Sequence, residues 1–483
     1  MAILLALLSL AVVQPLSSAQ VGPPSDLAML CKRCRCDYDP GTWMVPENAT
    51  IEPPDSDSLL VNCSRTSTSP FAGAFEWPDV PLHHEEPPEE DPTVPWRPAS
   101  RADFSWCNLA GGVRPLPIVK ARRLRELSLS QNLFSWLEVD AFKGLPSLKL
   151  LDLSGNKLAA IRAEAFPLSS DVAFASNLED VRLSHNMLLA VPWEAMLRLP
   201  ELERLDLGHN SIKSLDDDYK LVPSDATFNS LKVLNLTSNK LTVLKSTVMA
   251  KFTELLELDL SWNNLETVPE VFLSTVKPLN NRTVGLRSLN RTVTPFGLVN
   301  LRSLILDGNP IKVLGKNSFA GVPSLTSLSL SSMGTLVDVD PDVLSGLWFL
   351  EKLRLSRNPQ LSHLPELMFQ AMRKSERWTL KKVDLSYNSL ETLKEDTLPW
   401  EEIDFLDLQG NPWICNCSLQ WMLDDWMPVI YKKDSGYLFD LRCAKPNWLR
   451  GRRFVHWLNR SEGIFCGKRS AALIQEVSIK RSK

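Results

Sequence analysis

Cysteine, histidine and tyrosine are scarce in this chain, and long apolar runs are missing after its first residues. Its 483 residues include nine cysteines, six histidines and five tyrosines, and no cysteine lies between Cys107 and Cys415. No run of about 18 apolar residues follows the first 19, so no membrane span is predicted. The formal charge of −4 lacks the basic field of a nucleic-acid binder. The chain also lacks Gly-x-Ser-x-Gly, His-Glu-x-x-His and a phosphate loop, so we predict neither an enzyme nor a cofactor.

The first 19 residues have the character of a secretory signal peptide. An apolar run ends in Ser17-Ser18-Ala19, which predicts cleavage before Gln20 and a secreted, extracellular chain. Cysteines confined to the two ends fit an oxidising compartment, where disulfides close exposed ends. Metal binding by Cys31-x-x-Cys34 is the alternative. A truncated receptor ectodomain would have the same features.

Sequons for N-glycosylation agree with secretion, because the acceptor Asn-x-Ser/Thr marks surface sites of secreted proteins. Two of the seven, at Asn62 and Asn416, have cysteine in the middle and are set aside. The predicted glycan sites are Asn48, Asn235, Asn281, Asn290 and Asn459.

A nine-residue pattern, Leu-x-x-Leu-x-Leu-x-x-Asn, recurs eleven times between Leu124 and Asn411. A period of about 20–30 residues indicates a solenoid, and this pattern resembles the leucine-rich repeat. We therefore predict an α/β solenoid, a curved arc with a parallel sheet on its concave side, closed by disulfides at both ends. The copies begin at Leu124, Leu148, Leu178, Leu202, Leu231, Leu255, Leu301, Leu325, Leu350, Leu380 and Ile403.

Strand side chains alternate between two faces, which assigns the positions of each repeat. The first, fourth and sixth residues point inward, and the third, fifth, seventh and eighth line the concave face. The ninth-position asparagine should hydrogen-bond buried backbone groups along the stack. Repeat eight has Met333 at this place, so we predict a looser turn there. Phe142, Phe166 and Phe319 are predicted to pack the convex side.

The repeats divide the chain into segments. The run from Leu82 to Pro92 is acidic and rich in proline, and it lies in a stretch too polar to order itself. A basic partner held by this run is the alternative reading. The predicted segments are a signal peptide (1–19), a cysteine-rich N-terminal cap (20–123) with a disordered insert (about 64–100), the repeats (124–411) with an insert near 273–298, a cysteine-rich C-terminal cap (412–466) and a basic disordered tail (467–483).

The C-terminal flank carries a family resemblance. Asn411-Pro-Trp-Ile-Cys-Asn-Cys-Ser-Leu419 continues to Trp426, Cys443-Ala-Lys-Pro446 and Phe465-Cys466. This resembles the cysteine-rich cap of extracellular leucine-rich repeat proteins such as Slit, the Toll-type receptors and the tartan/capricious adhesion proteins. The resemblance implies two disulfides, Cys415–Cys443 and Cys417–Cys466.

The N-terminal Cys31-Lys-Arg-Cys34-Arg-Cys36 resembles the matching N-terminal cap of that family, which implies a Cys31–Cys36 disulfide. Cys34 then has two candidate partners. Cys63 lies in a strand-like motif, and Cys107 has the usual distance to the first repeat; we favour Cys34–Cys63. With five cysteines in this region, one is left unpaired or bonds another chain.

The outward positions predict a concave face whose charge changes along its length. Repeats one to six supply mostly acidic residues, such as Glu126 and Asp180, whereas repeats nine and ten supply basic ones. Aromatic and arginine side chains are typical interface anchors. The predicted ligand-binding residues are Trp262, Ile305, Lys352, Arg354, Arg357, Lys382, Tyr387 and Phe405.

Three further features carry alternative interpretations. His185 and His209 hold the eighth position of adjacent repeats and should stack, either as surface residues or as a pH-sensitive or metal site. Arg450-Gly-Arg-Arg453 is either a solvated basic surface or a contact for heparan sulfate. A glycan at Asn235 would block the middle of the concave face and direct a ligand toward repeats seven to eleven.

These observations predict a secreted protein that binds an extracellular or cell-surface protein through its repeats, in adhesion, guidance or receptor recognition. The alternatives are a matrix component that binds glycosaminoglycans and an innate immune recognition protein. No nucleic acid and no metal are expected as partners.

Overall fold

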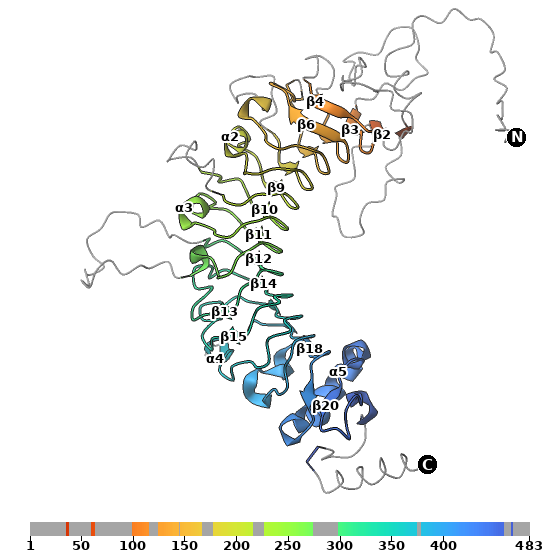
Figure 1. Cartoon of the computed structure of the whole chain (residues 1–483), viewed down its shortest axis with the longest axis vertical. Coiled ribbons are helices and arrows are strands. Elements are labelled where there is room, and N and C mark those ends of the chain that lie inside the picture. Colours follow the sequence, from red (N-terminus) through yellow and green to blue (C-terminus); the bar gives the residue numbers. More distant parts are fainter. Residues whose placement is uncertain are drawn as a thin grey trace, which may run out of the picture.

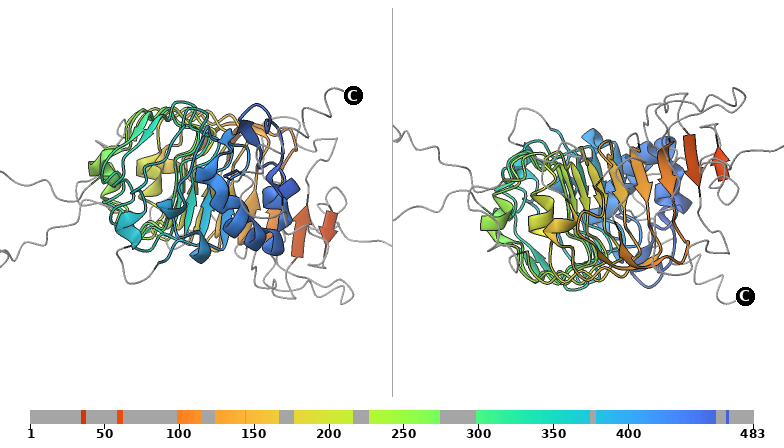
Figure 2. Two further views of the ribbon diagram at one scale, coloured as in Figure 1. Left: turned by 90° about the horizontal axis from the view of Figure 1, so that it is seen from below. Right: turned by 90° about the horizontal axis from the view of Figure 1, so that it is seen from above.

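The computed structural model is a curved solenoid (Figure 1). Its parallel strands line the inner side of the arc, and the short helices lie on the outer side. Seen from below and above, successive turns lie over one another (Figure 2). The structure describes residues 35–37, 59–62, 99–114, 124–143, 145–166, 177–215, 227–273, 298–373, 378–457 and 465–466.

Each of the eleven copies of the motif forms one strand from its third to its fifth residue. Neighbouring strands pair in parallel with equal positions opposite, as in Leu127 opposite Leu151. They belong to a sheet of 14 strands among the described residues, with the order β1-β2-β3-β5-β7-β8-β9-β10-β11-β12-β14-β16-β17-β18. The repeat strands are Glu126–Ser128 (β5), Leu150–Asp152 (β7), Asp180–Arg182 (β8), Arg204–Asp206 (β9), Val233–Asn235 (β10), Glu257–Asp259 (β11), Ser303–Ile305 (β12), Ser327–Ser329 (β14), Lys352–Arg354 (β16), Lys382–Asp384 (β17) and Phe405–Asp407 (β18).

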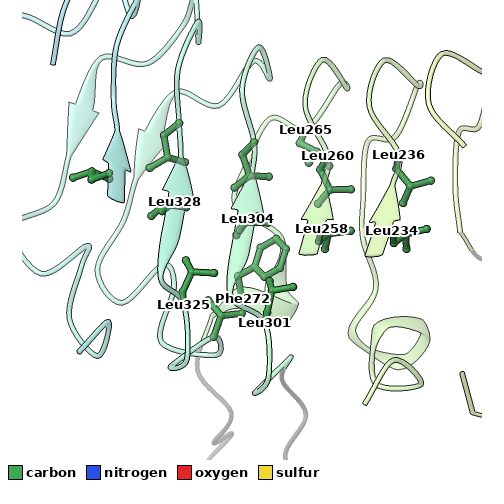
Figure 3. Close-up of a cluster of buried hydrophobic side chains, with 14 of the residues drawn as sticks. Leu234, Leu236, Leu258, Leu260, Leu265, Phe272, Leu301, Leu304, Leu325 and Leu328 are labelled. Atoms are coloured by element: carbon green, nitrogen blue, oxygen red, sulfur yellow. The ribbon is translucent and has the colours of Figure 1, made fainter. Parts of the chain in front are cut away.

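The inward positions form one continuous apolar core. Leu148, Leu151 and Leu153, at the first, fourth and sixth positions of repeat two, are all fully buried. Figure 3 shows the same stacking in repeats five to eight, where leucines of neighbouring strands line up under the sheet. Because burying one leucine stabilises the fold by about 1.5–3 kcal/mol, the period of the leucines determines the period of the turns.

The ninth-position asparagines form a buried hydrogen-bond ladder, as predicted. Asn186, for example, accepts from the backbone N–H of Leu158 at 3.0 Å and donates to the carbonyls of Leu153 and Leu183 at 2.9 and 3.0 Å. The amide thus links its own turn to the preceding one. The buried asparagines are Asn132, Asn156, Asn186, Asn210, Asn239, Asn263, Asn309, Asn358, Asn388 and Asn411.

The looser turn predicted at Met333 is not found, so that prediction was wrong. Ser332, which precedes it, has a φ of 57°, close to the 54–58° of the same position in neighbouring turns such as Tyr387 and Arg357. The Met333 side chain is fully buried, and its N–H donates to Asn358 Oδ1 at 2.8 Å. The flexible thioether fills the space of the missing amide, so the backbone keeps its turn.

The convex side is packed by the predicted phenylalanines and by short helical turns. Phe142, Phe166 and Phe319 are fully buried, and the first two rings stack with centroids 5.5 Å apart. Two small parallel sheets flank the core, Ala110–Val113 (β4) with Leu133–Leu137 (β6) and Val313–Leu314 (β13) with Asp338–Val339 (β15). The helical segments are Ala163–Ala165 (η2), Trp193–Met196 (α2), Ser246–Met249 (α3), Glu270–Phe272 (η4), Gln370–Arg373 (α4), Glu395–Thr397 (η5) and Trp400–Glu402 (η6).

The sheet continues beyond the first repeat toward the N-terminus. Arg35–Asp37 (β1) pairs antiparallel with Leu59–Asn62 (β2), which runs parallel to Ala99–Asp103 (β3). β3 in turn pairs in parallel with β5 of repeat one. The predicted disordered insert therefore ends before Ala99, because the last two residues assigned to it begin β3.

The C-terminal cap closes the other end of the core with buried aromatic residues. Trp413 and Trp426 are fully buried. Two disulfides, Cys415–Cys443 and Cys417–Cys466, join the cysteines that the family resemblance pairs. The elements of the cap are Trp413–Ile414 (β19), Cys417–Leu419 (η7), Met422–Trp426 (η8), Met427–Lys433 (α5), Ser435–Leu438 (η9), Cys443–Lys445 (β20) and Phe454–Trp457 (η10).

Several predictions fall outside the described residues. These are the signal peptide, the acidic run, the insert after Leu273, the basic tail and the pairing of Cys31, Cys34 and Cys63; of Cys36 only the backbone is described. The predicted glycan sites Asn48, Asn281, Asn290 and Asn459 also lie there. Across the described ranges, no helix combines the length and the apolar character that a bilayer crossing requires.

Candidate functional site

The basic part of the concave face is built on β16 and β17. Lys352 and Lys382 occupy the third position of adjacent repeats and lie directly opposite each other in the sheet. Arg354 shares β16 with Lys352, two residues on, so both side chains point out of the same face. All three side chains are exposed.

The charge of this group is poorly compensated. Among the described residues, neither Lys352 nor Lys382 forms an ion pair, and the Nε of Arg354 lies 3.9 Å from Asp384 Oδ2, at the limit of an ion pair. Like charges directly opposite on neighbouring strands destabilise a sheet. Folding therefore gains nothing from the two lysines, whereas an anionic ligand would relieve their repulsion.

The C-terminal cap packs on repeat eleven, the repeat next to this basic group. Phe405 lies opposite Lys382 in the sheet, and its ring packs edge-to-face on Tyr437 of η9 with centroids 4.7 Å apart. The N–H of Asp440 donates to Gln409 Oε1 at 2.8 Å, which ties the cap to the last repeat. The basic residues thus have the preceding repeats on one side and the Phe405–Tyr437 pair on the other.

The eighth-position residues form a rim where the strands end. Their backbone is left-handed, with φ of 55° at Trp262, 58° at Arg357 and 54° at Tyr387. Trp262 and Tyr387 are 57% and 47% exposed, and each ring lies over the glycine of the next repeat. A Cβ at Gly308 would come within 2.5 Å of the Trp262 ring, so only glycine permits this position of the indole. The guanidinium carbon of Arg357 lies 5.4 Å from the centre of the Tyr387 ring.

The predicted ligand-binding residues separate into two groups. Lys352, Arg354, Lys382 and Phe405 lie together on β16 to β18, with Arg357 and Tyr387 on the adjoining rim. Trp262 and Ile305 belong to repeats six and seven, and Ile305 is half-buried between Asp259 and Ser329. The structure therefore places most of the predicted residues around the basic group, with two of them two to three strands away.

A family model for the leucine-rich repeat matches residues 122–168, 176–219 and 299–360. These segments coincide with repeats whose strands and asparagine ladder are described above. These three segments of the chain contain leucine-rich repeats.

Curated relatives resemble the repeat region. Tsukushi from Mus musculus is 32% identical over 274 residues, which cover 56% of this chain and 60% of the mouse protein. Lumican from Coturnix japonica is 31% identical over 215 residues, 43% of this chain and 57% of that protein. The matches thus span only three fifths or less of the length of these relatives. A chain of the octameric complex of Latrophilin 3, Unc5D and FLRT2 superposes with a TM-score of 0.47 at 21% identity, covering 71% of this chain and 91% of that chain.

Aspartates on the concave face form hydrogen bonds that stabilise the turns after the strands. Asp152, Asp259 and Asp384, all at fifth positions, accept the N–H of the residue two positions on at 2.8 to 3.0 Å. These bonds hold the chain where each strand ends, as aspartates do in turns. The fifth-position aspartates are therefore explained by the repeat itself, whereas the basic residues are not.

Two of the carboxyl groups in the C-terminal half of the repeats are shifted in pKa. Burial raises the pKa of Asp407, and the nearby charge of Asp384 raises it further, against the hydrogen bond from the Gln409 N–H. Burial likewise raises the pKa of Asp307, which accepts from the Ser329 hydroxyl and the Ser331 N–H, both at 2.7 Å.

Asp407→Asn should stabilise the fold by a few tenths of a kcal/mol at pH 7, discounted for partial exposure. Because the pKa of Asp407 is raised in the folded chain, its contribution to stability is present below the unfolded pKa and is lost as pH rises through the folded pKa. The asparagine variant avoids this loss and keeps an acceptor for Gln409. Urea unfolding at pH 7 and pH 3 checks this, with the exposed Asp404→Asn as control. An equal gain for Asp407→Asn at both pH values would contradict it.

His185 and His209 stack as their positions predict, with ring centroids 4.0 Å apart and planes 8° from parallel. Both are exposed. Within the ranges that the structure describes, no group of three histidine, cysteine or carboxylate side chains is arranged to hold a metal ion. The pair is a stacked surface feature of the rim, next to the half-buried Ser238.

Asn235 lies in the middle of the concave sheet, on β10 between Asp206 and Asp259. Its Oδ1 accepts the Thr237 N–H at 2.9 Å, and the Thr237 hydroxyl lies 2.7 Å from that of Ser261. A glycan on this side chain would have to stand out of the face that carries the fifth-position aspartates. Its presence stays a prediction, and it would leave β16 to β18 open.

Trp106 also lies on the rim, although none of the eleven copies of the motif includes it. β3 begins a further turn in which Trp106 has a φ of 59° and is 55% exposed, while the buried Cys107 takes the ninth position. The N–H of Cys107 donates to Asn132 Oδ1 at 3.0 Å. The pattern Ala-x-x-Ala-x-Phe-x-x-Cys from Ala99 to Cys107 carries this turn, but alanines replace its leucines.

Proposed function

We propose that this leucine-rich repeat protein is a secreted, non-enzymatic binding module that holds an extracellular protein against repeats nine to eleven. Leucine-rich repeat proteins are typically binding proteins, and the relatives Tsukushi and lumican are secreted. An open arc offers a long surface without an enclosed catalytic pocket. The role is recognition of a partner in adhesion, guidance or receptor signalling.

One observation supports this proposal above the others. Lys352 and Lys382 lie side by side without a carboxylate partner among the described residues, and the exposed Tyr387 follows Lys382 by five residues in the same repeat. Such a group costs folding energy and is not required by the repeat. Charged residues beside aromatic anchors are the usual composition of a binding hot spot.

Lys352→Glu combined with Arg354→Glu should reduce binding of the purified chain to intact cells at least about tenfold, because both substitutions reverse a charge on the proposed binding surface. Flow cytometry with a labelled chain measures the effect. Lys213→Glu with Lys240→Glu is the matched control, because both lysines are exposed outside the strands.

A thermal melt of each variant establishes that it is folded. The proposal fails if the Lys352/Arg354 variant melts normally and binds cells as the unmodified chain does. It also fails if the control variant loses as much binding, since the effect would then reflect net charge only.

The C-terminal cap favours a second candidate function, binding of glycosaminoglycans in the matrix. Arg450 and Arg452 are exposed, whereas Arg453 stacks on the exposed Phe439, 4.1 Å from its ring centre. Heparan sulfate binds such surfaces through charge and releases them in salt. Binding to cells that survives high salt and enzymatic removal of heparan sulfate excludes this candidate.

A further inference from the structure

The rim of the arc has a low point between two large side chains. The eighth positions of repeats six to nine are Trp262, Gly308, Ser332 and Arg357. The Trp262 indole lies over Gly308, and Arg357 leans the other way along the stack, toward Tyr387. The residue between them is the small, half-buried Ser332, so the side chains of the rim are smallest at this place.

Trp262 combines a left-handed backbone with an exposed side chain. The left-handed backbone is common to the eighth positions of the rim and is disfavoured for a bulky residue. More than half of the Trp262 side chain remains exposed, so its burial stabilises the fold little. Gly308 lies against the indole ring. An aromatic side chain that is already held in one position loses little conformational entropy when a ligand binds. Trp262 is therefore suited to anchor a ligand.

The charges along this path exclude a uniformly anionic ligand. Asp259 and Asp307 lie beside the Trp262 end, close enough for the charge of Asp259 to raise the pKa of Asp307. At the other end, Lys352, Lys382 and Arg354 are exposed. A sulfated polysaccharide would place negative charge at both ends and be repelled at the first. A polypeptide can instead carry an apolar residue at one end and carboxylates at the other.

The spacing of the two ends determines the length of the recognised segment. Repeats six and nine are three strand steps apart, β11 to β12 to β14 to β16. At about 4.8 Å per step this is about 14 Å across the strands, and the offset from the eighth position of Trp262 to the fifth of Arg354 adds about 10 Å along them, so the ends are about 17 Å apart. An extended chain advances about 3.3–3.6 Å per residue, so about five residues bridge the distance.

We propose that the ligand presents an extended acidic peptide, with an apolar side chain on Trp262 and a carboxylate pair about five residues further on, against Lys352, Lys382 and Arg354. This inference rests on the proposed function and names its partner class. The peptide runs across the strands, and it passes over the rim at Ser332.

Synthetic peptides on the full folded chain test the inference by fluorescence anisotropy. The probe is a fluorescein-labelled peptide with one phenylalanine, a spacer of about four glycine and serine residues, and two glutamates. It should bind at least about tenfold more tightly than peptides with a one-residue spacer or with glutamines for the glutamates. Trp262→Ala should weaken the probe about tenfold but leave a peptide with serine for phenylalanine unchanged. Trp262→Phe, which keeps a flat ring, should stay within about threefold.

Equal affinities for both spacers, or no binding of any peptide, would overturn the inference. A heparin hexasaccharide that binds more tightly than the probe, and is indifferent to Trp262→Ala, would overturn it in favour of a polysaccharide. If Lys352→Glu with Arg354→Glu still abolishes binding to cells in these cases, the proposed function stands and only the peptide class is wrong.

Discussion

Replacing Asn186 with alanine is expected to lower the free energy of unfolding by about 3 kcal/mol. The substitution removes the acceptor for the buried Leu158 N–H and the donor to the carbonyls of Leu153 and Leu183. Both carbonyls keep one amide, from Asn156 and Asn210, but the Leu158 N–H is left without its partner. An unsatisfied buried donor costs about 1–3 kcal/mol. The hydrogen bonds from the Asn186 amide to the carbonyls of Leu153, Leu183 and Ser184 are lost as well.

Asn177→Ala provides the comparison, because Asn177 is exposed and donates a single hydrogen bond, to the Pro146 carbonyl at 3.2 Å. We expect a change below about 0.5 kcal/mol there. Chemical unfolding followed by circular dichroism measures both variants. If the two substitutions cost the same, the buried amides are not what joins the turns, and the leucines alone stabilise the stack.

The fold follows from the sequence wherever a residue type is repeated at a fixed interval. Leucines that recur at three positions can be buried together only if each copy of the motif forms one turn, and this predicts the strands residue by residue. The repeat interval predicts the local structure less well where a different residue type takes a position of the motif. Met333 fills the place of an asparagine without loosening its turn, and the strand at Ala99 escaped notice because Ala99 and Ala102 are weak apolar markers.

The candidate site is only partly predictable, for a different reason. That Lys352 and Lys382 share a face and a row follows from strand alternation and equal register. The position of Trp262 over Gly308, and of Arg357 toward Tyr387, depends on side-chain torsions and on the size of the next residue, which the repeat pattern does not determine. The contact of Phe405 with Tyr437 depends on the fold of the cap. The cap contains no sequence repeat from which that fold could be predicted.

Removing the Cys415–Cys443 disulfide should destabilise the C-terminal end of the solenoid by about 3–4 kcal/mol. The bond closes a loop with a sequence separation of 28, and a loop of this length is expected to stabilise a fold by about that amount. Both cysteines are buried beside the cap's aromatic core, which includes Trp413. Cys415→Ala with Cys443→Ala therefore loosens the cap that covers repeat eleven.

The loss should be local, because each turn of a solenoid contacts only its neighbours. Hydrogen exchange should accelerate from β18 toward β16, while β7 and β8 keep their protection. Since Phe405 and the lysines lie on these same strands, the variant should also weaken binding to cells, and reductant should reproduce both effects in the unmodified chain. Uniform acceleration along all strands would contradict local unravelling, and unchanged exchange at β18 would show that the cap holds without this bond. Stability of the cap and occupancy of the basic site are thus expected to be lost together, from the same end of the arc.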